Sequence, residues 1–161
     1  QDFIIDDNLF ASEYYSIYGE IYHKIENFNK SDEYYDLSLS YNNENVYVLN
    51  NYSYYLSLRG EKLELALDMT RLCNELTTNN PNSSFLDTYA WVLYKLNLFD
   101  KAKAQIEKAI KLEANSSTLF DHYGDILFKL GDKTGALSEW QRALSIDPQK
   151  NEIRNKIIEN E

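Results

Sequence analysis

The chain has 161 residues, with 26 acidic and 16 basic side chains and a formal net charge of −10 at pH 7. Nucleic acids and anionic membranes bind surfaces with clustered lysine and arginine, so this balance argues against both as partners. No apolar run in the sequence approaches the roughly 20 residues that cross a bilayer, which argues against membrane insertion as well.

Five glycines and two prolines leave little room for the turns of a strand-rich domain, so we expect helices throughout. Residues 1–11 contain Phe3, Ile4 and Ile5, which we interpret as the remnant of a preceding helical unit or the lead-in to the first helix. A frayed terminus is the alternative. The start at Gln1 without Met indicates a fragment or a processed chain. Both an exported or periplasmic location and a cytoplasmic location fit this start.

Residues 12–45 predict a first helical hairpin, because large and small residues follow one another at helical spacing. These first-helix positions are Tyr15, Tyr18, Gly19 and Tyr22. The second helix, at about 30–41, places Ser31 and Ser38 in packed positions, where a hydroxyl must donate to a backbone carbonyl. We expect this hairpin to be looser than the last two. Residues 1–45 carry ten acids against two lysines, so this end of the chain would steer a basic partner.

Residues 46–82 predict a second hairpin, which ends at the breaker Asn79-Asn80-Pro81. It is about three residues longer than its neighbours, and we expect an extended turn or a longer second helix at about 62–77. The single cysteine, Cys73, falls at a small-residue position of that helix and cannot form an intrachain disulfide. We interpret it as a packed thiol.

Residues 83–116 and 117–150 align with each other at an offset of 34 residues. The identical pairs include Asp87/Asp121, Tyr89/Tyr123, Leu93/Leu127, Lys95/Lys129, Leu96/Leu130, Ala102/Ala136 and Ala109/Ala143. A fixed period with matched apolar positions indicates stacked helical hairpins. In the last hairpin Gly124 and two alanines let the helix backbones approach, while Trp140 fills the space between them. These positions should therefore resist enlargement.

The last hairpin carries large, large, small and large residues in its first helix, followed by Ala, aromatic, Ala and Pro. The residues are Phe120, Tyr123, Gly124, Leu127, Ala136, Trp140, Ala143 and Pro148. This pattern resembles the tetratricopeptide repeat (TPR) family, as the C-terminal fragment of a longer bacterial-type TPR protein. The resemblance implies an all-α, right-handed α-solenoid of four tandem helix–turn–helix hairpins. An amphipathic stripe at 151–161 predicts a C-terminal capping helix.

In the TPR family the first helices line a concave groove, and carrying that register over gives a groove of aromatic and acidic residues. The groove residues are Glu20, His23, Asn50, Tyr54, Asp87, Trp91, Tyr94, Asp121 and Asp125. Trp91 is either a hot spot for a partner or a packing contact with the neighbouring first helix. The clamp that some members use for carboxylate tails is not built, because Ser16 and Glu20 stand at two of its positions and Trp91 at a third. Only Asn51 and Lys95 match it.

We therefore expect a non-catalytic protein–protein interaction scaffold that binds an extended peptide or a partner helix, with basic or aromatic residues in the partner. The alternative is a structural segment of a longer solenoid, acting through its ends or its convex face. Phe3, Ile4 and Ile5 would then favour self-association through the N-terminal end. His23 and His122 lie about three repeats apart, and neither ligand spacing nor a glycine-rich phosphate loop occurs. We expect no catalytic residues, no metal and no cofactor.

Overall fold

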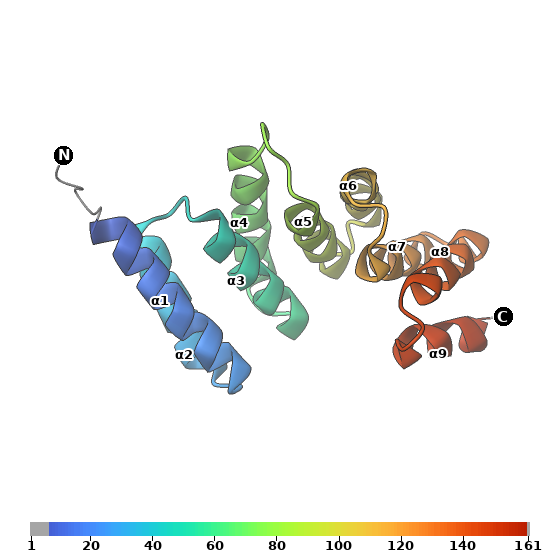
Figure 1. The fold of residues 1–161 in the computed structure, drawn as a ribbon, viewed down its shortest axis with the longest axis horizontal. Helices are drawn as coiled ribbons and strands as arrows, with labels where there is room; N and C mark the ends of the chain where they lie inside the picture. The colour runs from blue at the N-terminus through green and yellow to red at the C-terminus, as the bar shows by residue number, and fades with distance from the viewer. Residues whose placement is uncertain (1–6, 161) are drawn as a thin grey trace. The chain divides into compact units, whose positions relative to one another are not determined.

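The computed structural model describes residues 7–160, so Phe3, Ile4 and Ile5 lie outside the described residues. Within that range the chain forms nine α-helices and no strand (Figure 1), which confirms the all-helical prediction. The helices group into two compact units, which divide between Asn79 and Asn80. Each unit is a succession of helical hairpins.

The first unit contains two hairpins, in which α1 pairs with α2 and α3 pairs with α4. Asparagine side chains cap two of these helices: Asn27 accepts from the Lys30 N–H, and Asn45 accepts from the Val48 N–H. Gly60 ends α3 in the left-handed conformation, with a φ of 70°. The helices are α1 (Asp7–Lys24), α2 (Phe28–Tyr41), α3 (Val46–Arg59) and α4 (Leu63–Leu76).

The serines of α2 find the backbone carbonyls that the sequence requires. The Ser31 hydroxyl donates to the Gly19 carbonyl at 2.8 Å, and the Ser38 hydroxyl donates to the Ser12 carbonyl at 2.6 Å. Both carbonyls belong to α1, so each hydroxyl joins the two helices of the hairpin instead of bending its own helix. Both serines are fully buried.

The extra residues of the second hairpin lie elsewhere than expected. Helix α4 has 14 residues, as α2 and α6 have, so it is not lengthened. Helix α3 is instead one residue longer than α5, at 14 against 13. The connection 77–82 is also longer than the connections 42–45 and 113–116. Helical packing fixes the length of a hairpin arm, whereas a connection at the surface tolerates insertion.

Cys73 lies inside the second hairpin, where its thiol donates to the Val46 carbonyl at 3.3 Å. Burial raises the pKa of the thiol to about 12, so the reactive thiolate is scarce at neutral pH. These contacts agree with a packed thiol.

The second unit contains two further hairpins and a final helix. Its helices are α5 (Ser83–Lys95), α6 (Phe99–Leu112), α7 (Ser117–Lys129), α8 (Lys133–Ile146) and α9 (Asn151–Asn160). Helix α9 packs against α8, and its residues Ile153 and Ile157 are buried in one cluster with Phe120 and Trp140. Helix α9 thus covers the apolar face that α7 and α8 leave open at the C-terminal end.

Gly124 sets how closely the helices of the last hairpin approach. A Cβ built at this position would overlap the Trp140 indole, and Trp140 itself is buried in the cluster. The same relation holds in the first hairpin, where a Cβ on Gly19 would lie 2.9 Å from the Tyr35 ring. Each glycine is therefore the partner of one large side chain.

We expect Gly124→Ala to lower the free energy of unfolding by up to about 2 kcal/mol. Overpacking typically costs about 1–3 kcal/mol, which outweighs the roughly 1 kcal/mol that alanine gains over glycine in a helix. In the Trp140→Leu background the same substitution should be neutral or stabilising, because the indole is absent. Urea unfolding followed by circular dichroism measures both effects. A penalty of equal size in both backgrounds would contradict this explanation.

Candidate functional site

Trp91 lies in a stack of three rings on the first helices of the second unit. Its indole is 4.7 Å from the Tyr94 ring, at an interplanar angle of 10°. On the other side it lies 4.2 Å from the His122 ring, at 18°. Trp91 and Tyr94 are three residues apart on α5 and share one face of it, while His122 comes from α7. The indole therefore packs on the neighbouring first helix.

Asp87 holds His122 in this stack. Its Oδ1 atom lies 2.7 Å from Nδ1 of His122, and both side chains are largely buried. The carboxylate reaches from α5 to α7, so the pair ties the two first helices together. The Asp87 carboxylate thus already has a partner within the chain, in His122.

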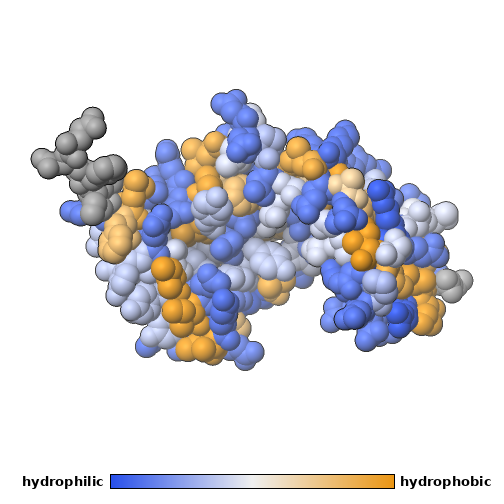
Figure 2. All heavy atoms as spheres, in the orientation of Figure 1, coloured by the Kyte–Doolittle hydropathy of each residue, from blue (hydrophilic) through white to orange (hydrophobic). Residues whose placement is uncertain are grey.

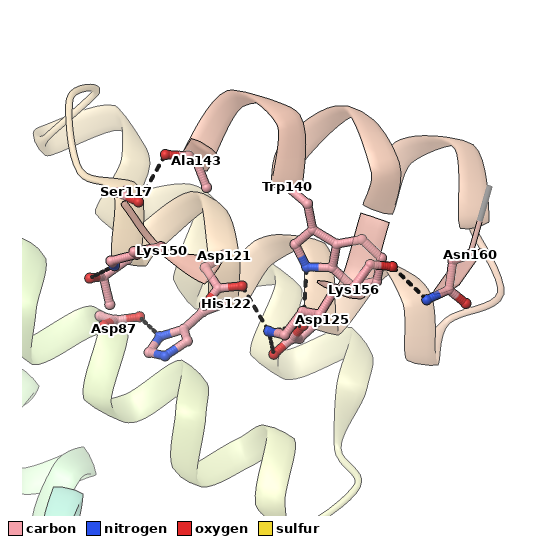
Figure 3. A network of polar contacts seen from close by, with 11 residues as sticks. Asp87, Ser117, Asp121, His122, Asp125, Trp140, Ala143, Lys150, Lys156 and Asn160 are labelled. Carbon is pink, nitrogen blue, oxygen red and sulfur yellow. Dashed lines mark hydrogen bonds and ion pairs between the residues drawn. The ribbon is translucent and has the colours of Figure 1, made fainter. Parts of the chain in front are cut away.

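Asp121 and Asp125 are both held by Lys156 of the final helix (Figure 3). The Lys156 Nζ atom lies 2.7 Å from Oδ1 of Asp121 and 2.7 and 2.8 Å from the two oxygens of Asp125. The Trp140 indole N–H also donates to Asp125, at 3.1 Å. The acidity that the sequence predicted for this part of the groove is therefore offset by a cation from the same chain.

Burial and charge act in opposite directions in this cluster. Burial raises the pKa of Asp125, and the hydrogen bonds and charge of Lys156 lower it only in part. Burial alone would lower the pKa of Lys156, but its hydrogen bonds to Asp121 and Asp125 outweigh burial and raise it. The Lys156 ammonium therefore stabilises the ionised form of the largely buried Asp125 carboxyl.

Sequence reasoning did not find Lys156 or the partnership of His122. The apolar stripe of 151–161 was visible, and Lys156 stands beside its buried residue Ile157. A lysine at the edge of a buried stripe is a common arrangement on any amphipathic helix. Nothing in the sequence singled this one out, because its partners lie 35 and 31 residues away.

Part of the aromatic surface of α5 remains accessible. Trp91 and Tyr94 are only partly buried, and the Lys95 ammonium lies 5.1 Å from the centre of the Trp91 ring. The Trp91 indole nitrogen is itself covered and has no hydrogen-bond acceptor among the described residues. A partner would therefore meet the ring edges of Trp91 and Tyr94 and the lysine, not the indole N–H.

The candidate residues of the first unit do not form a single cluster. His23 stacks on Tyr55 of α3, with ring centres 3.5 Å apart at an angle of 14°. Burial, followed by the charge of Arg59, lowers the pKa of His23. The remaining three have separate contacts: Glu20 pairs with Lys24 at 2.8 Å, Asn50 donates to Asn51 at 3.0 Å, and the Tyr54 ring lies 6.0 Å from Tyr55.

An ion-pair network in the first unit was also missed. Arg59, the last residue of α3, places Nη2 at 2.6 Å from Oδ1 of Asp32 on α2. Its guanidinium lies 5.0 Å from the centre of the Phe28 ring, and Lys62 reaches the other oxygen of Asp32 at 2.9 Å. These contacts join the two hairpins, and we assign them a structural role.

The described residues also bear on metal binding and membrane insertion. No group of three or more His, Cys, Asp or Glu side chains among residues 7–160 has an arrangement that could hold a metal ion. No helix in the described part of the chain combines the length and apolar character needed to cross a bilayer.

A sequence model of the tetratricopeptide repeat family matches residues 12–45, 84–116 and 118–150. These segments make up more than half of the chain, which therefore belongs to the tetratricopeptide repeat family. The long second hairpin, α3 and α4, lies between the matched segments. No curated protein sequence matches the chain.

Solved structures confirm the predicted fold class, an all-α solenoid of tandem hairpins. A chain of the APC/C hetero-tetramer Cut9–Hcn1 has a TM-score of 0.82 and 14% identity, over 91% of this chain and 29% of that one. TTC0263, a TPR protein from Thermus thermophilus, has a TM-score of 0.76 and 18% identity, over 92% and 80% of the two chains. The first TPR of Spaghetti (RPAP3), bound to the HSP90 peptide SRMEEVD, has a TM-score of 0.64 and 19% identity, over 71% and 89%. This chain thus spans less than a third of the Cut9–Hcn1 chain.

We expect Lys156→Met to lower the free energy of unfolding by about 1–3 kcal/mol at pH 7, because it leaves Asp121 and Asp125 without their cation. Removing one partner of a fully buried pair costs roughly 3–5 kcal/mol. Here the Lys156 and Asp125 side chains are 32% and 15% exposed, so solvent screens part of the loss.

The deficit should shrink as the pH falls from 7 towards about 4. Burial already raises the pKa of Asp125, and loss of the ammonium raises it further. Such a carboxyl destabilises the folded state at a pH above its folded pKa, where it is ionised. The destabilisation disappears at a pH below its unfolded pKa, where the carboxyl is protonated in both states. Urea unfolding of both proteins at the two pH values measures the change.

Lys150→Met is the matched control, since the Lys150 ammonium donates to the Thr118 hydroxyl at 3.0 Å. It should remain close to the unsubstituted chain at both pH values. An equal deficit of Lys156→Met at both pH values would show that the lysine acts through packing alone.

Proposed function

We propose that this chain is a non-catalytic module that binds an extended peptide or a helix of a protein partner on the faces of its first helices. The observation that carries the proposal is the stacked pair of Trp91 and Tyr94 on α5, with Lys95 above the indole. Tryptophan and tyrosine are enriched among the residues that contribute most to protein binding. His122 and Asp87 hold the stack in place, so little side-chain freedom would be lost on binding.

The charges favour an aromatic or apolar segment over a basic one in the second unit. Its three candidate acids already have partners, because His122 engages Asp87 and Lys156 engages Asp121 and Asp125. A basic peptide would have to compete with Lys156 for Asp121 and Asp125, and with His122 for Asp87. In the first unit Glu20 pairs with Lys24 on an exposed surface, where the pair is weak and easily replaced. A basic residue of the partner would therefore bind there more readily.

The peptide would differ from the one bound by the first TPR of Spaghetti, whose sequence SRMEEVD is acidic at its end. Of the positions that resemble the carboxylate clamp, Ser16, Glu20 and Trp91 offer no ammonium, and only Asn51 and Lys95 match. An acidic tail would meet Glu20 in the first unit, and like charges repel. We therefore propose a segment without a terminal acidic cluster.

The test starts with peptides selected on the unsubstituted chain from a displayed random library. Trp91→Ala should weaken the selected peptides by about tenfold or more, since truncating a hot-spot residue costs on the order of 2 kcal/mol. Tyr54→Ala tests the face of the first unit separately. Fluorescence anisotropy measures each affinity, and thermal unfolding confirms that each variant is folded.

Tyr41→Ala is the matched control, because Tyr41 is an exposed tyrosine on a second helix, α2. It should bind every selected peptide as the unsubstituted chain does. Undiminished binding by folded Trp91→Ala and Tyr54→Ala variants would remove the first-helix faces from the proposal.

A further inference from the structure

One face of α1 is apolar and exposed. Phe10, Tyr14, Ile17 and Ile21 follow one another at helical spacing, and Ile25 continues the row just after the helix ends. These five side chains, the α1 stripe, are 46% to 64% exposed. Figure 2 shows orange, apolar atoms along part of α1. A continuous apolar row of this kind marks an interaction surface, whereas single exposed apolar residues do not.

The repeat register shows what kind of surface this is. Tyr14 and Ile21 correspond to Leu119 and Ile126 of α7 at three repeat periods, and both of those residues are buried. Helix α7 packs against α5 and α6 of the preceding hairpin. On α3 the residue equivalent to Tyr14 is Val48, which is buried as well. The α1 stripe is thus the face that a hairpin of this chain otherwise buries against helices.

The C-terminal end of the chain cannot supply the missing contact to another copy. Helix α9 covers the apolar face of α7 and α8, and buries Ile153 and Ile157 in doing so. A head-to-tail association of copies would have to displace α9 and its Lys156 ion pairs. The apolar face that a second copy offers is its own α1 stripe.

The α1 stripe is complementary to itself in an antiparallel arrangement. The pairs Phe10/Ile25 and Tyr14/Ile21 are symmetric about the point between Ile17 and Tyr18. Two antiparallel copies of α1 therefore place an aromatic ring opposite a branched aliphatic side chain in each of these pairs. A two-fold interface requires this kind of self-complementarity.

The charges beside the stripe fit the same arrangement. Glu13 and Lys24 lie on the same side of the stripe, and a two-fold axis brings that side of each helix together. Lys24 then lies within one helical turn of Glu13 of the second copy. This pairing offsets part of the repulsion between the two acidic first hairpins.

We propose that two copies of this chain associate through antiparallel pairing of their α1 stripes, as a two-fold symmetric dimer. The proposal is independent of peptide binding at Trp91, because the stripe and Trp91 lie on different helices in different units.

Sedimentation velocity over a wide concentration range tests the proposal on the whole chain. The unsubstituted protein should show a monomer–dimer equilibrium. Ile17→Lys should weaken dimerisation at least about tenfold, because it places two ammonium groups near the two-fold axis. Ile158→Lys is the matched control, since Ile158 is an equally exposed isoleucine on α9. It should dimerise normally.

Two further variants test the pairing geometry. Glu13→Lys should weaken the dimer, and adding Lys24→Glu should restore it, because the second change returns opposite charges to facing positions. A mixture of Tyr14→Cys and Ile21→Cys chains should form the mixed disulfide in preference to either symmetric one.

A chain that stays monomeric at every concentration would overturn the proposal, even if another protein were found on the stripe. A dimer that survives Ile17→Lys would place the interface elsewhere. Neither of these two outcomes changes how strongly the Trp91→Ala variant binds the selected peptides. The dimer proposal and the peptide-binding proposal can therefore fail separately.

Discussion

The close approach of two helix backbones within each hairpin is the constraint on which the structure depends. Gly124 and Gly19 carry no side chain where Trp140 and Tyr35 occupy the space between the helices. This contact sets the separation and rotation of the paired helices. It thereby decides which residues face the next hairpin and which face solvent. The positions of the aromatic stack on α5 and of the exposed stripe on α1 both follow from that rotation.

Packing within a hairpin was predictable from the sequence, because it depends on residue size at a fixed period. The buried serines show this: Ser31 and Ser38 occupy alanine-like positions, and their need for a carbonyl was evident before the structure. Contacts between polar side chains were not predictable. His122 meets Asp87 at a separation of 35 residues, and Lys156 meets Asp125 at 31. The Asp87–His122 pair recurs one repeat later as Asp121–Lys156, again at a separation of 35 residues. Because the second position changes from histidine to lysine, residue size and the apolar pattern did not reveal either pair.

The polar pairs change the meaning of the acidic composition. A net charge of −10 predicts a surface that attracts cations, yet Lys156 already holds Asp121 and Asp125 of α7, and His122 holds Asp87 of α5. The predicted groove positions of the second unit thus leave Trp91, Tyr94 and Lys95 partly exposed. The exposed apolar row lies instead on α1, in the most acidic segment of the chain. Recognition by shape and apolar contact therefore fits the molecule better than recognition by charge alone.

The pairing of a small residue with a large one has a consequence for how such repeats evolve. Equivalent positions in the other two hairpins hold Ala90 with Ile106 and Ser53 with Thr70, and all four side chains are buried. Where glycine is the small member, the large member is tryptophan or tyrosine, and where alanine or serine stands there, the large member is isoleucine or threonine. The sizes of the two residues are thus coupled. Natural variants of this chain should accordingly show covariation at these two positions, with single changes counter-selected and compensated double changes retained.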